Sequence, residues 1–440
     1  VDTQPILNGM LVVDRFALFF TGLVTICALA TVFTSANYLN RFGMSRGEFF
    51  SMLFFSTMGM IIIASALDLI ALFIGIELMS LAVYVLVAFR RRDLLSNEAA
   101  LKYFLIGAFA IGFFLYGVSL IYGLTGSTNY HVIAAAVADK DLVLNPVFLL
   151  AIALILAGLG FKVSAVPFHM WTPDAYQGAP TPVTSFMATA VKAASFAALL
   201  RLFMVCFMAN QDQWVGIIMV LAVVTMTVGN VIALVQRNIK RMLAYSSIAH
   251  AGYILIGVAA LNMDNANASS AVLFYVTVYA FMTLGAFALV SAIEKKGVTR
   301  GLEEPDYAGL GLTHPFLGFC MAAFMFSMAG IPPTGGFFAK YYIFSAAVGE
   351  GLVWLVVLGV LNSALSLYYY LRVIVVLYMQ KREAPVTVHA DLGVRIVLLV
   401  CLLAVLWLGF GPTGPGFIPG LENVLEWTRT SLATVGQPGM

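Results

Sequence analysis

The sequence predicts an all-α polytopic membrane protein, and three observations support this fold class. The 440-residue chain is 62% hydrophobic and only 10% charged, with a mean hydropathy of +0.97, a balance that soluble domains do not have. Apolar segments of about 20 residues, long enough to cross a bilayer, recur along the chain. Positive charges gather in alternate loops between these segments, as expected when successive helices cross in opposite directions.

Twelve apolar segments are interpreted as spanning helices. The fifth continues, broken, towards residue 178. The tenth is too long for one crossing and contains Pro332 and Pro333, which predict a break because proline cannot continue a helix. The segments are 15–36, 48–66, 68–88, 98–123, 147–166, 183–207, 214–235, 240–261, 270–293, 315–348, 352–379 and 391–411.

The loops after the first, third, seventh, ninth and eleventh segments hold most of the loop cations. Since cytoplasmic loops are enriched in Lys and Arg, these loops are predicted to be cytoplasmic and both termini to face outward. The opposite loops hold only Lys140, and the ends carry Arg15 and Arg429. The cytoplasmic set is Arg41, Arg46, Arg90, Arg91, Arg92, Arg237, Lys240, Arg241, Lys295, Lys296, Arg300, Lys381 and Arg382.

Two inverted sets of five helices follow from this orientation, over residues 48–207 and 214–380. In each set the fourth helix carries the proline break, with Lys162 before the first break and Lys340 after the second. Inverted repeats with broken helices are typical of secondary transporters, whose sites lie near the middle of the membrane. The remaining regions are an N-terminal remnant with one helix, 1–47, and a C-terminal helix and tail, 381–440.

The first break lies in the stretch from Phe161 to Lys192, FKVSAVPFHMWTPDAYQGAPTPVTSFMATAVK, which contains four prolines. Its partner in the second set is GIPPTGGFFAK, which ends at Lys340. A broken helix leaves backbone groups unpaired, which is tolerated only where protein or a water-filled cavity surrounds them. A cation beside such a break is a candidate for a functional site.

Three further ionisable residues lie close to the centres of their segments. Glu77 is the only one of 21 acidic residues in such a place, and Lys192 and His250 occupy similar positions. Each is predicted to lie within about 5 Å of the membrane midplane, where a charge costs about 2.5–3.5 kcal/mol even on the mildest scale. Together with Lys162 and Lys340, these side chains make a proton relay chemically possible.

Structural roles compete with a relay at several of these residues. Glu77 and Lys162 could form an ion pair that only joins two helices. His250 could hydrogen-bond a carbonyl between helices. Lys102 lies four residues after Glu98, so a surface pair with snorkelling explains it at least as well as a relay does.

Two other charges and the cysteines receive structural interpretations. Asp174 is expected to cap the short helix or turn after Pro173, and Arg201 is expected to reach towards the outer side. Cys27, Cys206, Cys320 and Cys401 lie far apart in apolar segments and are interpreted as buried thiols. No spacing for haem, an iron–sulfur cluster, a metal or a nucleotide is present, and a net charge of +2 gives no indication of nucleic-acid binding.

Four stretches of the sequence carry a resemblance to a known family. They are the Phe161–Lys192 stretch, GIELMSLAVYVLVA around Glu77, YSSIAHAGY around His250 and SMAGIPPTGGFFAK around Lys340. The chain resembles the antiporter-like membrane subunits of respiratory complex I, the proton-translocating NADH–quinone oxidoreductase, over essentially its whole length. It is similar, more distantly, to subunits of multi-subunit sodium/proton antiporters.

The resemblance implies a fold of fourteen helices in which helices 4–8 and 9–13 are inverted repeats. The twelve segments seen here imply that two N-terminal helices are absent, consistent with a start at Val1. Both repeats are present, so the family's site residues carry over by matching position. They are Glu77, Lys162, Lys192, His250 and Lys340, and Lys102 also matches a lysine of the family by position.

The resemblance also implies a location and partners. The chain is expected in the bacterial inner membrane, beside other membrane-arm subunits that include its paralogues. Flavin, iron–sulfur clusters and the quinone site are expected in other subunits, and no cofactor in this chain. Two alternatives remain open: a subunit of a cation/proton antiporter without a redox reaction, or a scaffold whose buried charges only transmit electrostatic change.

Overall fold

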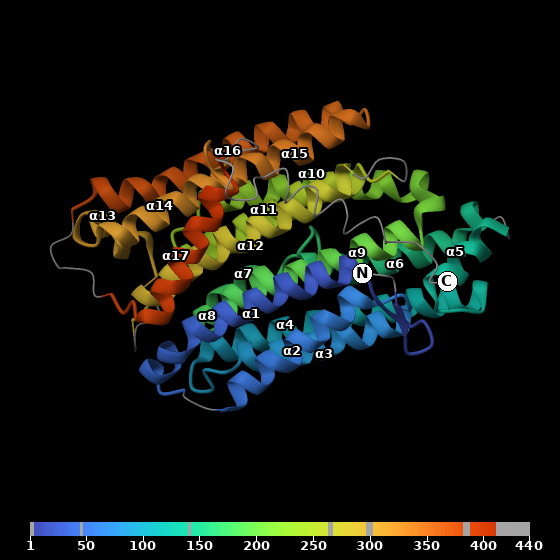
Figure 1. Cartoon of the computed structure of the whole chain (residues 1–440), viewed down its shortest axis with the longest axis horizontal. Helices are drawn as coiled ribbons and strands as arrows, with labels where there is room; N and C mark the ends of the chain where they lie inside the picture. The colour runs from blue at the N-terminus through green and yellow to red at the C-terminus, as the bar shows by residue number, and fades with distance from the viewer. Residues whose placement is uncertain are drawn as a thin grey trace.

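The computed structural model describes residues 4–44, 47–139, 142–262, 267–295, 302–381 and 388–410. In this part of the chain the long helices run in one common direction, and one helix near the end crosses them steeply (Figure 1). The predicted tail beyond residue 410 lies outside the described residues. So do several of the predicted loop and terminal charges, namely Arg46, Lys140, Lys296, Arg300, Arg382 and Arg429.

The chain begins with a short antiparallel hairpin that the sequence did not indicate. Strands β1 (Gln4–Ile6) and β2 (Leu11–Val13) pair with Gln4 opposite Val13 and Ile6 opposite Leu11. The first half of the bundle follows. Its helices are α1 (Arg15–Phe42), α2 (Gly47–Ser65), α3 (Leu69–Val87), α4 (Leu94–Thr125), α5 (Tyr130–Asp139), the 3-10 turn η1 (Leu142–Leu144) and α6 (Pro146–Val163).

The middle of the chain contains the first broken helix and the most buried elements. These are α7 (Trp171–Gly178), α8 (Thr181–Phe186), the π-helical turn η2 (Met187–Val191), α9 (Lys192–Val205), η3 (Met208–Asn210), α10 (Gln211–Leu234), α11 (Ile239–Ala259) and α12 (Asn267–Ile293). The last part contains the second broken helix. Its elements are η4 (Glu304–Tyr307), α13 (Leu310–Thr313), α14 (Pro315–Ala329), α15 (Gly335–Gly349), α16 (Val353–Met379) and α17 (Leu392–Trp407).

The predicted fold class is confirmed, since every predicted span coincides with helix. Among the described residues, ten helices are long and apolar enough to cross a membrane, counting α8 to α9 as one. The predicted tenth span is divided into α14 and α15, and the predicted twelfth span is the shorter apolar helix α17. The amphipathic helix α5 lies between predicted spans and was not anticipated.

Many helices begin at an Asp or Asn whose side chain accepts hydrogen bonds from the first backbone N–H groups. Such a residue satisfies donors that the helix itself cannot pair, which explains why the apolar segments start sharply at these positions. The capping residues are Asp14, Asp68, Asp93, Asn145, Asn238 and Asp391.

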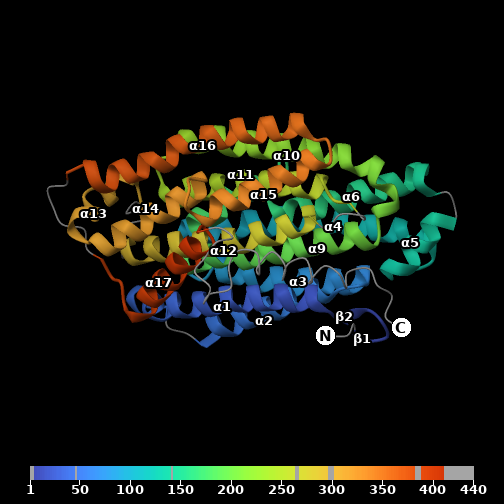
Figure 2. The ribbon, with the colours of Figure 1, turned by 45° about the horizontal axis from the view of Figure 1, so that its top comes forward.

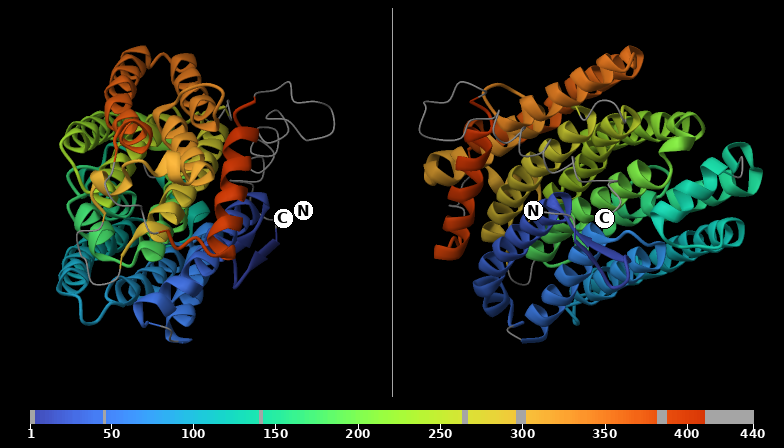
Figure 3. Two further views of the ribbon diagram at one scale, coloured as in Figure 1. Left: turned by 90° about the vertical axis from the view of Figure 1, so that its left-hand side faces the viewer. Right: turned by 45° about the vertical axis from the view of Figure 1, so that its right-hand side comes forward.

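The bundle has a buried centre and outer helices with uncovered apolar surfaces. Helix α11 is buried along almost its whole length, and so are α8–α9 and α12. Helices α2, α4, α10 and α16 are more than half uncovered. Helices α10 and α16 lie along the top of Figure 2 and α2 along its bottom, and all four lie on the outline of the bundle in the end-on view of Figure 3, left. Their uncovered side chains are apolar, such as Phe109 and Leu101 on α4, so this surface suits lipid or neighbouring membrane helices.

Glycines allow two helix pairs, α2 with α3 and α10 with α11, to approach closely. A Cβ atom on Gly59 of α2 would stand 2.5 Å from the backbone nitrogen of Met79 on α3. One on Gly252 of α11 would stand 2.5 Å from that of Met226 on α10. Small residues that let backbones meet are a main source of packing between membrane helices.

Both helix breaks begin with the same backbone geometry. Helix α6 ends before Ser164, which has φ 64°, and the N–H of Ala165 donates to the Gly160 carbonyl at 2.8 Å. Helix α14 ends before Gly330, which has φ 84°, and the N–H of Ile331 donates to the Phe326 carbonyl at 3.0 Å. A left-handed residue that closes the last turn stops a helix, so each helix ends some residues before its prolines.

Candidate functional site

Lys162 lies in the last turn of α6 and is 4% exposed. Its ammonium nitrogen donates to the hydroxyl of Ser80 on α3 at 2.6 Å. The rings of Phe161 and Tyr84 lie 5.1 Å and 5.7 Å from the same nitrogen, where their negative faces favour a cation. Lys162, the cation just before the first break, is therefore held against α3.

Glu77 lies one turn before Ser80 on α3 and is half-buried. Among the described residues it makes no ion pair and no hydrogen bond, although its charge acts on Lys162. The predicted Glu77–Lys162 contact is thus replaced by a contact between Lys162 and Ser80. The uncovered residues Ile74 and Leu81 share the helix face of Glu77, which places this carboxylate towards the edge of the bundle.

Lys192 is the first residue of α9, directly after the π-helical turn, and is 2% exposed. Its ammonium nitrogen donates to both oxygens of Ser247 on α11, at 2.6 Å to the carbonyl and 2.5 Å to the hydroxyl. Tyr176 on α7 lies 3.4 Å from the same hydroxyl, and the ring of Tyr279 on α12 lies 5.8 Å from the ammonium. No carboxylate pairs with Lys192 among the described residues.

His250 lies one turn after Ser247 on α11 and is 1% exposed. Its two ring nitrogens share hydrogen bonds with tyrosine hydroxyls, Nδ1 with Tyr275 at 2.7 Å and Nε2 with Tyr370 at 3.1 Å. The Tyr370 hydroxyl also lies 2.5 Å from the hydroxyl of Ser246. The alternative in which His250 bonds a helix carbonyl is wrong, because hydroxyl groups occupy both of its nitrogens.

Lys340 lies on α15 after the second break and is 5% exposed. Its ammonium nitrogen donates to the last carbonyls of α14, Met328 at 3.1 Å and Ala329 at 3.0 Å, and to the Ser363 hydroxyl at 2.8 Å. The negative end of a helix favours a cation at this place. A cavity of about 600 Å³ adjoins Lys340 between α15 and α16.

Helix α11 connects Lys192 and Lys340. Ser247, His250 and Tyr253 follow one another at intervals of three residues and share one face of this helix. Lys192 meets this face at Ser247, and the ammonium of Lys340 lies 5.0 Å from the ring of Tyr253. The structure therefore places Lys192, His250 and Lys340 beside one helix, and Lys162 lies against α3 instead. No hydrogen bond among the described residues joins these four side chains to one another.

Lys102 forms the pair predicted for it, with Glu98 at 2.7 Å, and its side chain is 45% exposed. The role expected for Asp174 is wrong. Helix α7 begins at Trp171, so Asp174 lies inside its first turn and makes no cap. Its carboxylate instead bonds Lys102 at 2.9 Å and Arg241 at 2.6 Å, which links α4, α7 and α11.

The expectation that Arg201 reaches towards the outer surface is also wrong. Its side chain is 2% exposed, and its guanidinium donates two hydrogen bonds of 2.8 Å to the carboxylate of Asp14. Asp14 also caps α1 through the N–H of Ala17. This buried pair joins α9 to the start of α1.

The partners of the buried cations were not found from the sequence. Ser80, Ser247, Ser363 and the tyrosines around His250 are uncharged, and hydroxyl residues occur throughout the chain. One pattern that could have indicated them is the run of polar residues Tyr245, Ser246 and Ser247 shortly before His250. In the part of the chain that the structure describes, no group of three His, Cys, Asp or Glu side chains is placed to hold a metal.

Comparisons with known proteins identify the class. A model of the NADH:quinone oxidoreductase/Mrp antiporter transmembrane family matches residues 66–366, and the chain belongs to this family. NADH-quinone oxidoreductase subunit N of Trichlorobacter lovleyi is 48% identical over 431 residues, which cover 97% of this chain and 85% of that protein. Subunit N 1 of Solibacter usitatus is 45% identical over 98% of this chain and 86% of its own length.

Solved structures agree with this assignment. A chain of respiratory complex I from Thermus thermophilus with bound aureothin matches with a TM-score of 0.77 and 36% identity, over 92% of this chain and 86% of that one. A chain of the Mrp complex from Dietzia sp. DQ12-45-1b has a TM-score of 0.84 at 23% identity, over 97% and 85%, and so shares the fold. The resemblance to the antiporter-like complex I subunits is confirmed. Both relatives named above are NADH-quinone oxidoreductase subunit N.

Proposed function

We infer that this chain is a proton-translocating membrane-arm subunit of NADH–quinone oxidoreductase, working beside other antiporter-like subunits in a bacterial inner membrane. The observation that carries this function is the buried set Lys192, Ser247, His250 and Lys340, gathered around α11 at the centre of a chain of this family. Ionisable groups at such depth are retained for a pathway rather than for stability. Electron transfer, flavin, iron–sulfur clusters and quinone binding belong to other subunits of the assembly.

The proposed relay uses side chains that can change protonation and hydroxyls that can pass a proton on. Lysine and histidine can each release and regain a proton, while serine and tyrosine hydroxyls both donate and accept hydrogen bonds. Lys192 delivers its proton at Ser247. Beside it, the hydrogen bonds of Tyr370 with His250 and Ser246 lead from α11 to α16, although no hydrogen bond among the described residues joins Ser247 to these groups. Lys340 is the terminal group on the far side of the second break.

Lys162 and Glu77 form the proposed control of the first half of the relay. Lys162 is held by Ser80, while Glu77, one turn before Ser80, has no ion-pair partner among the described residues. A carboxylate favours the charged form of a nearby lysine. A movement that brings Glu77 to Lys162 would therefore keep Lys162 protonated, and a movement of Glu77 away from Lys162 would favour release of that proton. Lys102, exposed and bound by two carboxylates, is assigned a surface role.

The test is substitution of Lys192 in the assembled complex. Lys192→Arg keeps a positive charge but removes easy proton loss, because arginine stays protonated, and Lys192→Met removes the charge. Both variants should lose most NADH-driven proton pumping in proteoliposomes, while NADH oxidation by an artificial acceptor at the hydrophilic arm persists. The matched control is Lys381→Arg, at an exposed lysine, which should pump normally.

The outcomes separate the alternatives. Wild-type stoichiometry in Lys192→Arg would exclude proton loss from this residue. Normal pumping in charge-neutralised variants of Lys162, Lys192 and Lys340 would favour the scaffold. A purified assembly that exchanges cations for protons without NADH dehydrogenase activity would favour the antiporter subunit.

A further inference from the structure

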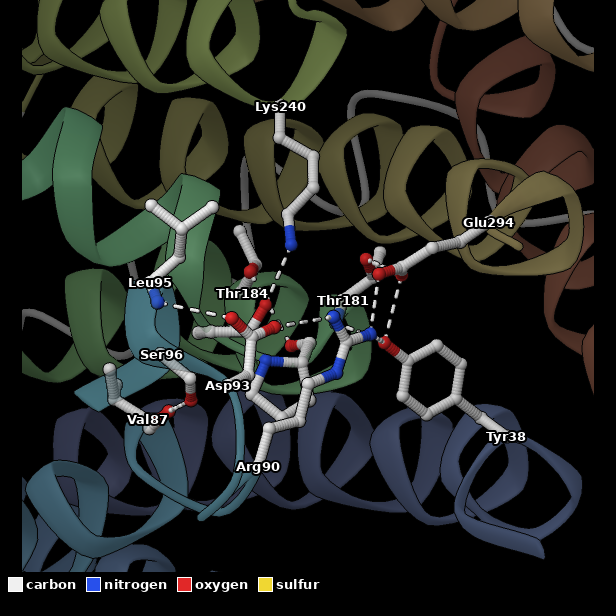
Figure 4. A network of polar contacts seen from close by, with 12 residues as sticks. Tyr38, Val87, Arg90, Asp93, Leu95, Ser96, Thr181, Thr184, Lys240 and Glu294 are labelled. Atoms are coloured by element: carbon white, nitrogen blue, oxygen red, sulfur yellow. Dashed lines mark hydrogen bonds and ion pairs between the residues drawn. The ribbon is translucent and has the colours of Figure 1, made fainter. Parts of the chain in front are cut away.

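A second buried charge cluster lies at the end of the bundle where α12 stops, away from the relay. It is defined by Tyr38 of α1, Arg90 after α3, Thr181 at the start of α8, Lys240 of α11 and Glu294 directly after α12, and it is called the Glu294 cluster (Figure 4). Lys240 and Thr181 are fully buried and Glu294 is 3% exposed. Glu294 was not among the candidate residues from the sequence because it follows the last residue of an apolar segment.

The Glu294 carboxylate collects three donors from the other half of the molecule. The Tyr38 hydroxyl donates to it at 2.8 Å, and the Arg90 guanidinium and the Thr181 hydroxyl donate as well. The guanidinium also stacks on the Phe42 ring at 4.5 Å. These bonds tie the end of α12 to the start of α8 and to α1, as Figure 4 shows.

The same cluster pairs the backbone groups left open by the first break. Pro180 and Pro182 have no N–H to offer. The Ala179 carbonyl accepts from the Lys240 ammonium at 2.6 Å, and the Thr181 N–H donates to the Tyr38 hydroxyl at 3.2 Å. Since unpaired backbone groups are tolerated in a membrane protein only with such partners, the joint between α7 and α8 depends on this cluster.

Glu294 is a fixed charge. Burial raises the pKa of its carboxyl, but Arg90 and Lys240 and the hydrogen bonds from Thr181 and Arg90 together hold that pKa below its ordinary value. The carboxylate therefore stays ionised at neutral pH and is unsuited to carrying a proton. Asp93, 3.8 Å from Arg90, supplies the second negative charge beside the two cations.

The position of the cluster connects it to Lys192. From Thr181 the chain runs through α8 and the π-helical turn into Lys192, eleven residues on, and these elements pack against α1 and α12. Helix α12 runs the opposite way, from Tyr279 beside the Lys192 ammonium to Glu294 beside Thr181. The bond between Thr181 and Glu294 thus sets the position of α8 and α9 along the axis of α12. This position determines whether the Lys192 ammonium reaches Ser247.

We propose that Glu294 is a positioning residue for Lys192, acting through the Glu294 cluster at the α7–α8 joint; this inference rests on the proposed role of Lys192 in proton transfer. Without the anchor, α8 and α9 can shift along α12. The contact between Lys192 and Ser247 is then lost in part of the molecules. Removal of one charge-assisted hydrogen bond changes such an equilibrium by about tenfold or more.

The experiment uses the assembled complex with Glu294→Gln, which removes the charge, and Thr181→Val, which keeps every charge and removes one hydroxyl. The matched control is Glu48→Gln, at an exposed glutamate of α2. Protons pumped per NADH, normalised to assembled complex, should be lower than in the wild type in both cluster variants and unchanged in the control. A structure of the Thr181→Val complex should show a population of molecules with Lys192 beyond hydrogen-bond distance from Ser247.

The outcomes separate a positioning role of Glu294 from a merely structural one. A merely structural role would lower the amount of assembled complex and leave the protons per NADH of the remainder unchanged, which would overturn the proposal. So would an intact Lys192–Ser247 contact in both variants. If Lys192→Arg abolishes pumping but the cluster variants pump normally, the positioning role of Glu294 is refuted and the proposed function stands. Normal pumping in Lys192→Arg would refute the proposed function itself.

Discussion

The pair between Arg201 and Asp14 allows a prediction about stability whose size follows from the structure. Both side chains are at most 2% exposed, and two hydrogen bonds of 2.8 Å join them. An exposed pair would contribute at most about 1 kcal/mol. Removal of one partner from a buried pair leaves the other charge uncompensated and costs about 3–5 kcal/mol. Asp14→Asn, which keeps a good capping side chain on α1, should therefore destabilise the subunit by about that amount.

Further substitutions separate the contributions. Asp14→Ala also removes the hydrogen bond from the Ala17 N–H, which should cost about 1 kcal/mol more. The double variant Asp14→Asn/Arg201→Met removes both charges. It should be more stable than the sum of the single changes predicts, because residues in contact couple by about 0.5–3 kcal/mol.

The measurement is the thermal stability of the purified complex in detergent, followed as loss of this subunit from the assembly. Arg15→Gln is the control, since Arg15 adjoins Asp14 in sequence but is exposed, and it should behave like the wild type. If Asp14→Asn matched this control, or if the effects of the single changes were strictly additive, the buried pair would not stabilise the junction of α1 and α9.

Two further predictions concern the first half of the relay and the orientation. Glu77→Ala and Lys162→Ala should each reduce pumping in fully assembled complex while artificial-acceptor activity persists. The double variant should lose less pumping than the sum of the two single losses, and strictly additive losses would refute the idea that the two residues act as a unit. A single cysteine in place of Arg92, exposed in the loop after α3, should resist an impermeant reagent added outside intact cells, because that loop is predicted to be cytoplasmic; efficient labelling would reverse the orientation.

The spans and breaks could be predicted from the sequence because each depends on local composition. Long apolar segments specify membrane helices, and proline excludes a straight one. The hairpin and α5 escaped because neither has a spanning length. The exact ends of the broken helices could not be predicted either, because Ser164 and Gly330 take the left-handed conformation three and two residues before the nearest proline.

The buried cations could be predicted individually, but their partners depend on how helices are rotated about their axes. Lys162 meets Ser80 rather than Glu77, although both residues belong to α3. Asp174 is expected from the sequence to act locally as a cap, yet α7 starts at Trp171, three residues before Asp174. Its carboxylate is then available to Lys102 and Arg241, which are distant in sequence.

The π-helical turn before Lys192 is the clearest case of information that the sequence hides. The residues Met187–Val191 read MATAV, with no proline or glycine to mark an irregular turn. Such a turn inserts one extra residue, which rotates everything after it by about 100° about the helix axis. In a regular helix continuing from Thr181, Lys192 would face a different neighbour. The wide turn therefore determines that this lysine meets Ser247 on α11, and a variant that restored regular α-helix there should separate the two as effectively as loss of the anchor at Glu294.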